Sequence, residues 1–196
     1  MQPNEQAAPA ATTDQEHRLI IAGFGGQGVL TIAKLLCTTA MSEGKNVTYL
    51  PSYGAEVRGG TANCQVVVSS GVIYSPLVEQ ADSLIILNQL SCDRFVVRLK
   101  PGGLLVLNSS AVALDDASQT GARQVLRLPA ADTAARIGNV KVTNSVMLGA
   151  FVRASGLVAE EDCLAALREH WSRRRAEVID PNVTAFRRGV ELAAEA

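Results

Sequence analysis

The sequence has few of the residue types that build metal and redox centres. It contains two histidines and four cysteines, and no two cysteines form a C-x-x-C pair. Zinc sites and cysteine-bound iron–sulfur clusters need close groups of such ligands, so we expect no metal to be bound by this chain. The cysteines are scattered singly along a chain without an export signal, which indicates a reducing cytoplasm. We expect most of them to be small core residues. The cysteines are Cys37, Cys64, Cys92 and Cys163.

Other absences limit the class of protein. Aromatic residues make up only 4% of the 196 residues, so the core must be aliphatic. The net charge of -1 argues against a nucleic-acid binder, which would carry a basic surface. No apolar stretch is long enough to span a bilayer, and the N-terminus lacks a secretory pattern. We therefore expect a cytoplasmic protein with neither nucleic acid nor membrane as a partner.

Known catalytic motifs are also missing. There is no G-x-S-x-G elbow, no Walker lysine and no histidine paired with a nucleophile. His170 lies among arginines, Arg168 and 173–175, which could bind phosphate but more often form a solvated helix face. We predict no catalytic residue in this chain.

The stretch around which the chain is organised begins at Leu19. An apolar run from Leu19 to Ala22 predicts a buried parallel strand, and apolar residues at helical spacing from Val29 predict a helix. Glycines between them suit a tight turn, close approach of a ligand to the backbone, and close helix–strand packing. The residues of this candidate cofactor-binding turn are Gly23, Gly25, Gly26, Gln27 and Gly28.

The start of that helix favours an anion, because its free N–H groups and its dipole point at the ligand. A dinucleotide site would also need an acidic residue at the end of the second strand, where Pro51-Ser52-Tyr53 stands instead. Three interpretations stay open: a turn that binds a phosphate, a stand-alone nucleotide-binding module, and a turn that serves packing alone.

A second glycine-rich stretch covers 51–64, where three glycines and a proline predict a shaped loop. Glu56 and Arg58 are either a local ion pair or, with Arg58 reaching an anion, part of a binding loop. The candidate substrate or partner residues are Ser52, Tyr53, Glu56, Arg58, Gly59, Gly60, Thr61 and, from another strand end, Asn88.

The order of elements predicts the fold class. Residues 1–17 form a tail that we expect to be disordered, and 18–196 form one domain. Strands alternating with helices predict an α/β, Rossmann-like, doubly wound and mostly parallel sheet. Its carboxyl edge would gather the glycine turn, the 53–61 loop and the asparagines Asn88 and Asn108. Further predictions are strands at 46–50, 65–69, 83–88, 104–107 and 123–128, and helices at 91–100, 129–137, 143–154, 160–171 and 180–194.

Two motifs together carry a resemblance to a known family. The segment Ile20–Val29, followed by Pro51–Asn63, resembles the gamma subunit of 2-oxoacid:ferredoxin oxidoreductases. Leu87-Asn88-Gln89, Lys100–Gly103 and Asn139–Ala150 match as well, so the resemblance covers nearly all but the tail. The pattern looks nearest to the 2-oxoglutarate gamma subunits, with pyruvate, branched-chain, indolepyruvate and arylglyoxylate relatives similar.

This resemblance implies a role inside a larger enzyme. The complex would convert a 2-oxoacid, CoA and oxidised ferredoxin to an acyl-CoA, CO2 and reduced ferredoxin. Thiamine diphosphate, Mg and [4Fe-4S] clusters would reside on alpha, beta and delta subunits, with this chain supporting assembly and the CoA side of the active site. A permanent subunit interface is apolar, and we expect Ser145–Ala154 with the glycine loop to supply it.

Overall fold

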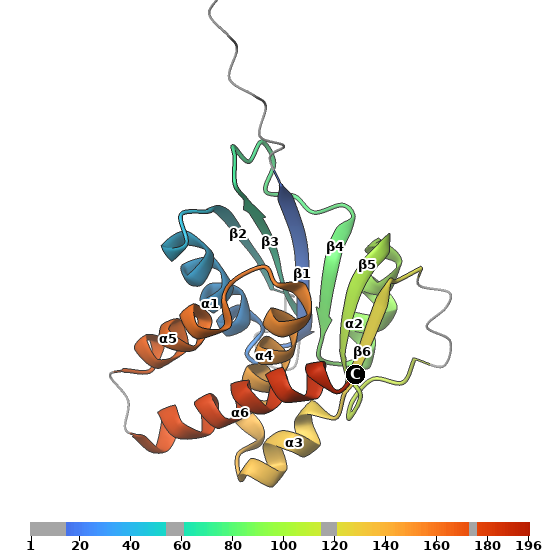
Figure 1. Ribbon diagram of the computed structural model, residues 1–196. Coiled ribbons are helices and arrows are strands. Elements are labelled where there is room, and N and C mark those ends of the chain that lie inside the picture. The colour runs from blue at the N-terminus through green and yellow to red at the C-terminus, as the bar shows by residue number, and fades with distance from the viewer. Residues whose placement is uncertain (1–14, 54–60, 115–120, 173–175) are drawn as a thin grey trace, which may run out of the picture.

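The computed structural model describes residues 15–53, 61–114, 121–172 and 176–196. A six-stranded sheet in the order β2-β3-β1-β4-β5-β6 forms its centre (Figure 1). The pairs β1–β4, β4–β5 and β5–β6 are parallel, whereas β3 is antiparallel to both of its neighbours. The predicted mostly parallel α/β sheet is thus confirmed. The strands are β1 Glu16–Phe24, β2 Asn46–Tyr53, β3 Thr61–Ser69, β4 Ala81–Ile86, β5 Leu99–Asn108 and β6 Gln124–Leu128.

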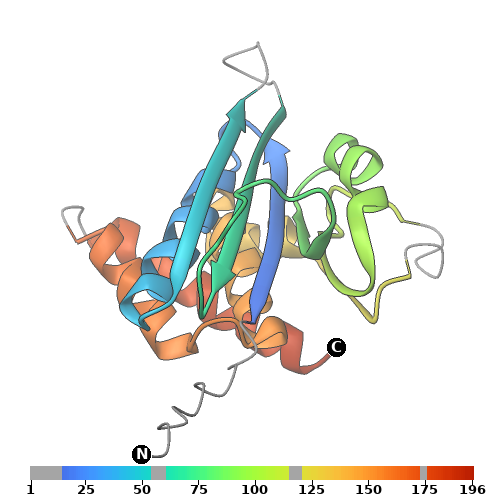
Figure 2. The same ribbon diagram turned by 90° about the horizontal axis from the view of Figure 1, so that it is seen from above.

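Helices cover the two faces of the sheet unequally (Figures 1 and 2). Most of them lie on one face and share one large aliphatic core with it. The other face carries α2 together with segments 73–78 and 112–114. The helices are α1 Val29–Ser42, α2 Gln89–Phe95, α3 Ala130–Ile137, α4 Thr143–Ser155, α5 Glu160–His170 and α6 Ala176–Ala194, with short 3-10 turns η1 Val96–Arg98 and η3 Val140–Val142.

The aliphatic composition is used in the core as predicted. Ile21 and Leu19 of β1 face the large helical layer, while Ile20 and Ala22 face the α2 side. All four side chains have no exposed surface. This continuous buried run is the pattern of a strand covered on both faces.

Several boundaries differ from the sequence prediction. Residues 51–53 belong to β2 and 61–64 to β3, so the predicted loop over 51–64 is wrong at both ends. Pro51 is tolerated because β2 is the edge strand of the sheet. β1 begins at Glu16, two residues before the boundary that we drew at Arg18.

Two helix boundaries were also wrong. The helix predicted for 91–100 ends at Phe95 and is followed by η1, after which β5 begins at Leu99. The last helix begins at Ala176, with Pro181 inside it rather than at its start. A proline near a helix start removes few hydrogen bonds, so it marks the beginning of a helix only to within a turn.

The helix α4 is internal to the molecule. Residues 145–152 are all buried, packed between the sheet and α6. The expectation that Ser145–Ala154 forms an exposed partner surface is therefore wrong: the small residues allow close packing within the chain. Large exposed apolar side chains lie elsewhere, and three of them, Val72, Tyr74 and Leu77, belong to the segment between β3 and β4.

Candidate functional site

The glycine turn joins β1 to α1 at the carboxyl edge of the sheet. Gly23 is the next-to-last residue of β1, where a side chain would come within 2.8 Å of Gln27 Oε1. Gly26 and Gly28 have φ values of 94° and 81°, a region that favours glycine. Gly28 is the N-cap of α1 and provides no side-chain cap. The first N–H groups of α1 are therefore left for a ligand or solvent.

The side chain of Gln27 stabilises the glycine turn through hydrogen bonds. Its Oε1 accepts hydrogen bonds from the Phe24 N–H at 2.7 Å and from Asn88 Nδ2 at 3.0 Å. Asn88 in turn caps α2, because its Oδ1 accepts from the Ser91 N–H at 2.9 Å. The side chains of Gln27 and Asn88 thus fix the glycine turn to the end of β4, which leaves the exposed backbone of Gly25 and Gly26 as the accessible part.

The predicted convergence at this edge holds for the described residues. Thr61 pairs with Phe24 across β3 and β1, and Asn108 donates to the Leu87 carbonyl at 3.3 Å. Ser52 lies farther out on β2, exposed and paired with Asn63. Tyr53 ends β2. The predicted site residues Glu56, Arg58, Gly59 and Gly60 lie outside the described residues.

Two hollows flank the turn. One, of about 290 Å³, lies where α1 starts and is bordered by Gly25, Thr31 and Ala62. The other, of about 280 Å³, lies between the turn and the start of α4. The polar side chains around the second hollow are Gln27, Asn108, Lys141 and Thr143. Sequence reasoning missed Lys141 and Thr143, because only the folded chain brings the start of α4 to the glycine turn.

The cysteines are core residues. All four are buried and free. Burial raises the pKa of Cys37 to about 11 and those of Cys64 and Cys163 to about 12, so these thiols stay protonated near neutral pH. Protonated thiols are poor ligands for iron–sulfur clusters. Within the described ranges no three His, Cys, Asp or Glu side chains are grouped to hold a metal ion, and no helix is both long and apolar enough to span a membrane.

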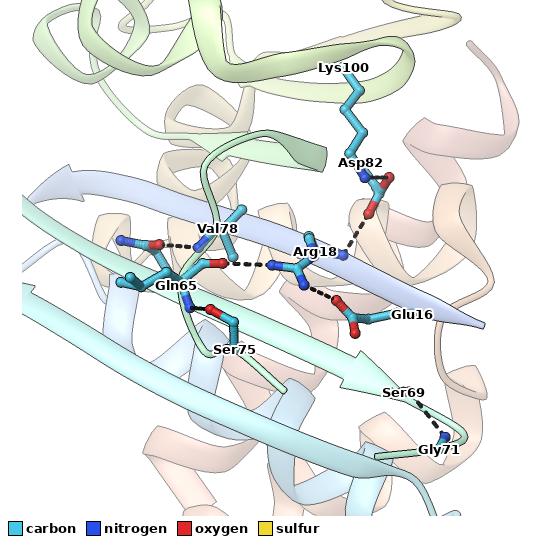
Figure 3. Close-up of polar contacts among 10 residues, drawn as sticks. Glu16, Arg18, Gln65, Ser69, Gly71, Ser75, Val78, Asp82 and Lys100 are labelled. Atoms are coloured by element: carbon cyan, nitrogen blue, oxygen red, sulfur yellow. Dashed lines mark hydrogen bonds and ion pairs between the residues drawn. The ribbon is translucent and has the colours of Figure 1, made fainter. Parts of the chain in front are cut away.

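A second polar cluster lies at the opposite, amino edge of the sheet (Figure 3). Asp82 accepts from the Arg18 N–H and from Lys100 Nζ, both at 2.7 Å. The Arg18 guanidinium donates to the Leu77 carbonyl at 2.6 Å and pairs with Glu16. The Val78 N–H donates to Gln65 Oε1 at 2.6 Å. These contacts fasten the segment that precedes β4 to the sheet, which is a structural role.

The topology bears on the dinucleotide interpretation. In the dinucleotide-binding fold the ribose acid stands at the end of the strand next to β1. Here β3 occupies that position and runs antiparallel, so β2 is displaced to the edge. The end of β2 also carries Ser52 and Tyr53 rather than an acid. The stand-alone nucleotide-binding module is therefore disfavoured.

A comparison of the sequence with known families decides the family. The model of the pyruvate ferredoxin/flavodoxin oxidoreductase family matches residues 18–192. The chain belongs to this family. The match includes the glycine turn, the 51–64 stretch and α4, and the family resemblance given by those motifs is confirmed.

Individual members of the family are similar over most of the chain. Ketoisovalerate oxidoreductase subunit VorA of Methanothermobacter thermautotrophicus is 36% identical over 99% of this chain and 40% of its own length. The 2-oxoglutarate synthase subunit KorC of the same organism is 33% identical over 89% of this chain and 94% of its own length. The chain thus spans about two fifths of VorA and nearly all of KorC.

Two solved structures share the fold of this chain. The gamma subunit of a keto/oxoacid ferredoxin oxidoreductase from Geobacter sulfurreducens has a TM-score of 0.77 and 31% identity, covering 92% of this chain and 99% of that one. A 2-oxoglutarate:ferredoxin oxidoreductase from Magnetococcus marinus, with 2-oxoglutarate, coenzyme A and succinyl-CoA bound, shares the fold at a TM-score of 0.85 and 23% identity, over 93% of this chain and 32% of that one.

Proposed function

We propose that this chain is the gamma subunit of a thiamine-diphosphate-dependent 2-oxoacid:acceptor oxidoreductase complex. The observation that carries the proposal is the family match over residues 18–192, which includes both glycine-rich motifs. The complex decarboxylates a 2-oxoacid, transfers the acyl group to CoA and passes the electrons to ferredoxin or another acceptor.

The chain's own residues support a binding and assembly role. Its thiols are buried and protonated, and its described residues offer no metal-ligand group. Buried, protonated thiols do not suit iron–sulfur clusters, and the family resemblance implies that the clusters, thiamine diphosphate and Mg are carried by alpha, beta and delta partner subunits. The proposed location is the cytoplasm.

The part of the reaction that we assign to this chain is the CoA side. The uncapped first turn of α1 and the exposed backbone of Gly25 and Gly26 suit a phosphate of CoA, because free N–H groups and the helix dipole both attract an anion. The arginine Arg58 lies in the stretch that joins β2 to β3 and would add a positive charge at the same edge. Gln27 and Asn88 hold the turn in shape through the hydrogen bonds that Gln27 Oε1 accepts.

Purification of the native complex tests the proposal. The untagged chain should co-elute with larger, brown, iron-containing subunits. The complex should reduce a viologen dye only when both CoA and one member of a panel of 2-oxoacids are present. The same panel identifies the oxoacid. We expect the residues that bind its side chain to lie largely on the other subunits. A chain that elutes alone, with no 2-oxoacid-dependent dye reduction in any fraction that contains it, would overturn the proposal.

A further inference from the structure

Exposed apolar side chains gather at the amino edge of the sheet, on the face that carries α2. Segment 70–80 joins the end of β3 to the start of β4, so both of its ends lie at this edge. It exposes three large apolar side chains, Val72, Tyr74 and Leu77, and Tyr74 is 91% exposed. Single exposed apolar residues are common in soluble proteins, whereas a cluster of them marks a surface that meets a partner.

The end of α2 adds to this surface. Arg98 of η1 donates to two backbone carbonyls of segment 70–80, so η1 lies beside that segment. The guanidinium groups of Arg94 and Arg98 both lie over the Phe95 ring, with their Cζ atoms 5.3 and 5.8 Å from its centre. Val97, next to Arg98 in η1, is a further large exposed apolar residue. Apolar and cationic side chains from two segments are thus held in one region of the molecule.

The exposed segment is fixed to the sheet by hydrogen bonds (Figure 3). Its Leu77 carbonyl accepts from the Arg18 guanidinium, and its Val78 N–H donates to Gln65 Oε1, both at 2.6 Å. Arg18 belongs to β1 and Gln65 to β3, so two strands hold the segment. A surface that is ordered before it binds loses little conformational entropy when a partner arrives.

Charges of both signs accompany the apolar side chains. Glu79 of the segment and Arg94 of α2 are exposed, and neither makes an ion pair within the described residues. Such a surface is complementary to a second copy of itself, because a two-fold axis can place the carboxylate of each copy opposite the guanidinium of the other. A partner with charge of a single sign would match only one of the two groups.

We propose that two copies of this chain pair about a two-fold axis through this amino-edge surface, which has Tyr74, Leu77 and Val97 at its centre and Glu79 and Arg94 at its rim. Glu79 of each copy pairs with Arg94 of the other. A stable interface buries about 800 Å² on each partner, so adjoining parts of the same face contribute as well. The carboxyl edge with the glycine turn lies at the opposite end of the strands, so this pairing leaves both candidate sites free for other subunits.

The mass of the untagged full chain in solution tests the pairing. Sedimentation equilibrium over a concentration series should give twice the mass of one chain. Tyr74→Ser and Leu77→Ser remove apolar groups from the centre of the contact, and each should raise the dissociation constant of the dimer at least about tenfold. Met41→Ser is the matched control and should leave the dimer intact, because Met41 is also exposed but belongs to α1, on the other face of the sheet.

A charge exchange tests the orientation of the two copies. Glu79→Arg places like charges opposite each other at both rim contacts, and so does Arg94→Glu, so each variant alone should be mainly monomeric. In an equimolar mixture of the two variants every rim contact again joins opposite charges. The mixture should therefore form a mixed dimer with nearly the wild-type dissociation constant. Misfolding of either variant cannot produce this rescue.

Two results would overturn the inference. The first is a wild-type chain that stays monomeric throughout the concentration series. The second is a dimer that neither Tyr74→Ser nor the single charge reversals weaken, because such a dimer would use another surface. Neither result bears on the proposed function, which is tested separately by co-elution with iron-containing subunits and by 2-oxoacid-dependent dye reduction.

Discussion

The glycines of the turn are required for different reasons, either lack of space for a side chain or a positive φ angle. Gly23 and Gly28 have no room for a methyl group, since Gln27 and Asn144 lie within 3 Å of its place. Gly26 has open space around it but a φ of 94°. A substitution at Gly26 therefore changes the surface that meets a ligand without displacing a neighbouring side chain.

We predict that Gly26→Ala raises the apparent KM of the assembled complex for CoA and leaves decarboxylation of the oxoacid nearly unchanged. The added methyl group hinders close approach of a phosphate while the dipole of α1 is retained. The positive φ should also cost about 1 kcal/mol of stability. Gly44→Ala is the matched control: its φ is 79°, its surroundings are open, and it lies at the far end of α1.

Steady-state kinetics and thermal unfolding of both variants check this prediction. Both should lose similar stability, and only Gly26→Ala should change the dependence on CoA. Normal CoA dependence in a fully assembled Gly26→Ala complex would leave the turn with a packing role alone.

At Arg58 the prediction concerns turnover. Arg58 stands among glycines in the sequence between β2 and β3, and because such segments often carry binding residues we expect its guanidinium to meet an anion or a partner rather than the core. Arg58→Ala should lower turnover of the complex with no change in the unfolding temperature of this subunit. The control is Arg153→Ala, which removes an exposed arginine paired with Glu160 at the end of α4. If the Arg58→Ala and wild-type complexes turn over at the same rate, both at saturating and at limiting CoA, Arg58 does not have this role.

At the scale of elements, the helices α4 and α6 pack closely where each has a glycine. At Gly149 of α4 a Cβ would come within 2.0 Å of the Phe186 carbonyl oxygen, and at Gly189 of α6 within 2.0 Å of the Val146 carbonyl oxygen. The backbones of α4 and α6 thus touch at two points. This contact holds the buried α4, and with it Asn144, at the level of the glycine turn.

We expect Gly149→Ala to destabilise the protein, although glycine to alanine in a helix interior ordinarily gains about 1 kcal/mol. The methyl group must push the two helices apart, and such overpacking costs about 1–3 kcal/mol. The expected net result is a drop of several degrees in Tm. Ala135→Gly, at an exposed position of α3, measures the ordinary helix preference. A rise in Tm for Gly149→Ala would show that the crossing is looser than the structure has it.

How far the sequence predicts each element depends on how local its causes are. The strand, turn and helix over 19–42 follow from neighbouring residues, and they were predicted correctly. The placement of β3 between β1 and β2 follows from pairing across the sheet, which no local pattern encodes. Lys141 and Thr143 were missed for the same reason, because they lie beside the glycine turn only once α4 has packed against it.

At the scale of the whole molecule, the two edges of the sheet differ in how completely their polar groups are hydrogen-bonded. The carboxyl edge carries the uncapped start of α1 and, beside it, Asn144 Oδ1 without a partner in the described part of the chain, whereas the polar side chains of the amino edge bond one another. At the amino edge His17 of β1 lies partly buried, with Nε2 3.0 Å from Ser83 Oγ of β4 and its ring against Phe151 of α4. His17 therefore links two strands and a helix.

The stability of the whole fold should depend on the protonation of His17. Burial lowers its pKa below the ordinary 6.5, with nearby Asp82 opposing and Lys100 adding to the shift. Between the folded and unfolded pKa values the unfolded chain binds a proton that the folded chain does not, so stability falls as pH drops below about 6.5. The stabilisation is complete above that pH.

Denaturant unfolding at pH 7.5 and pH 5.5 tests this dependence in wild type and in His17→Gln. Glutamine can keep a hydrogen bond to Ser83 but does not titrate. We expect the unfolding midpoint of wild type to fall more between the two pH values than that of His17→Gln, because titrating carboxylates contribute equally to both proteins. Equal losses in the two proteins would mean that His17 can be protonated in place, with the links among β1, β4 and α4 intact.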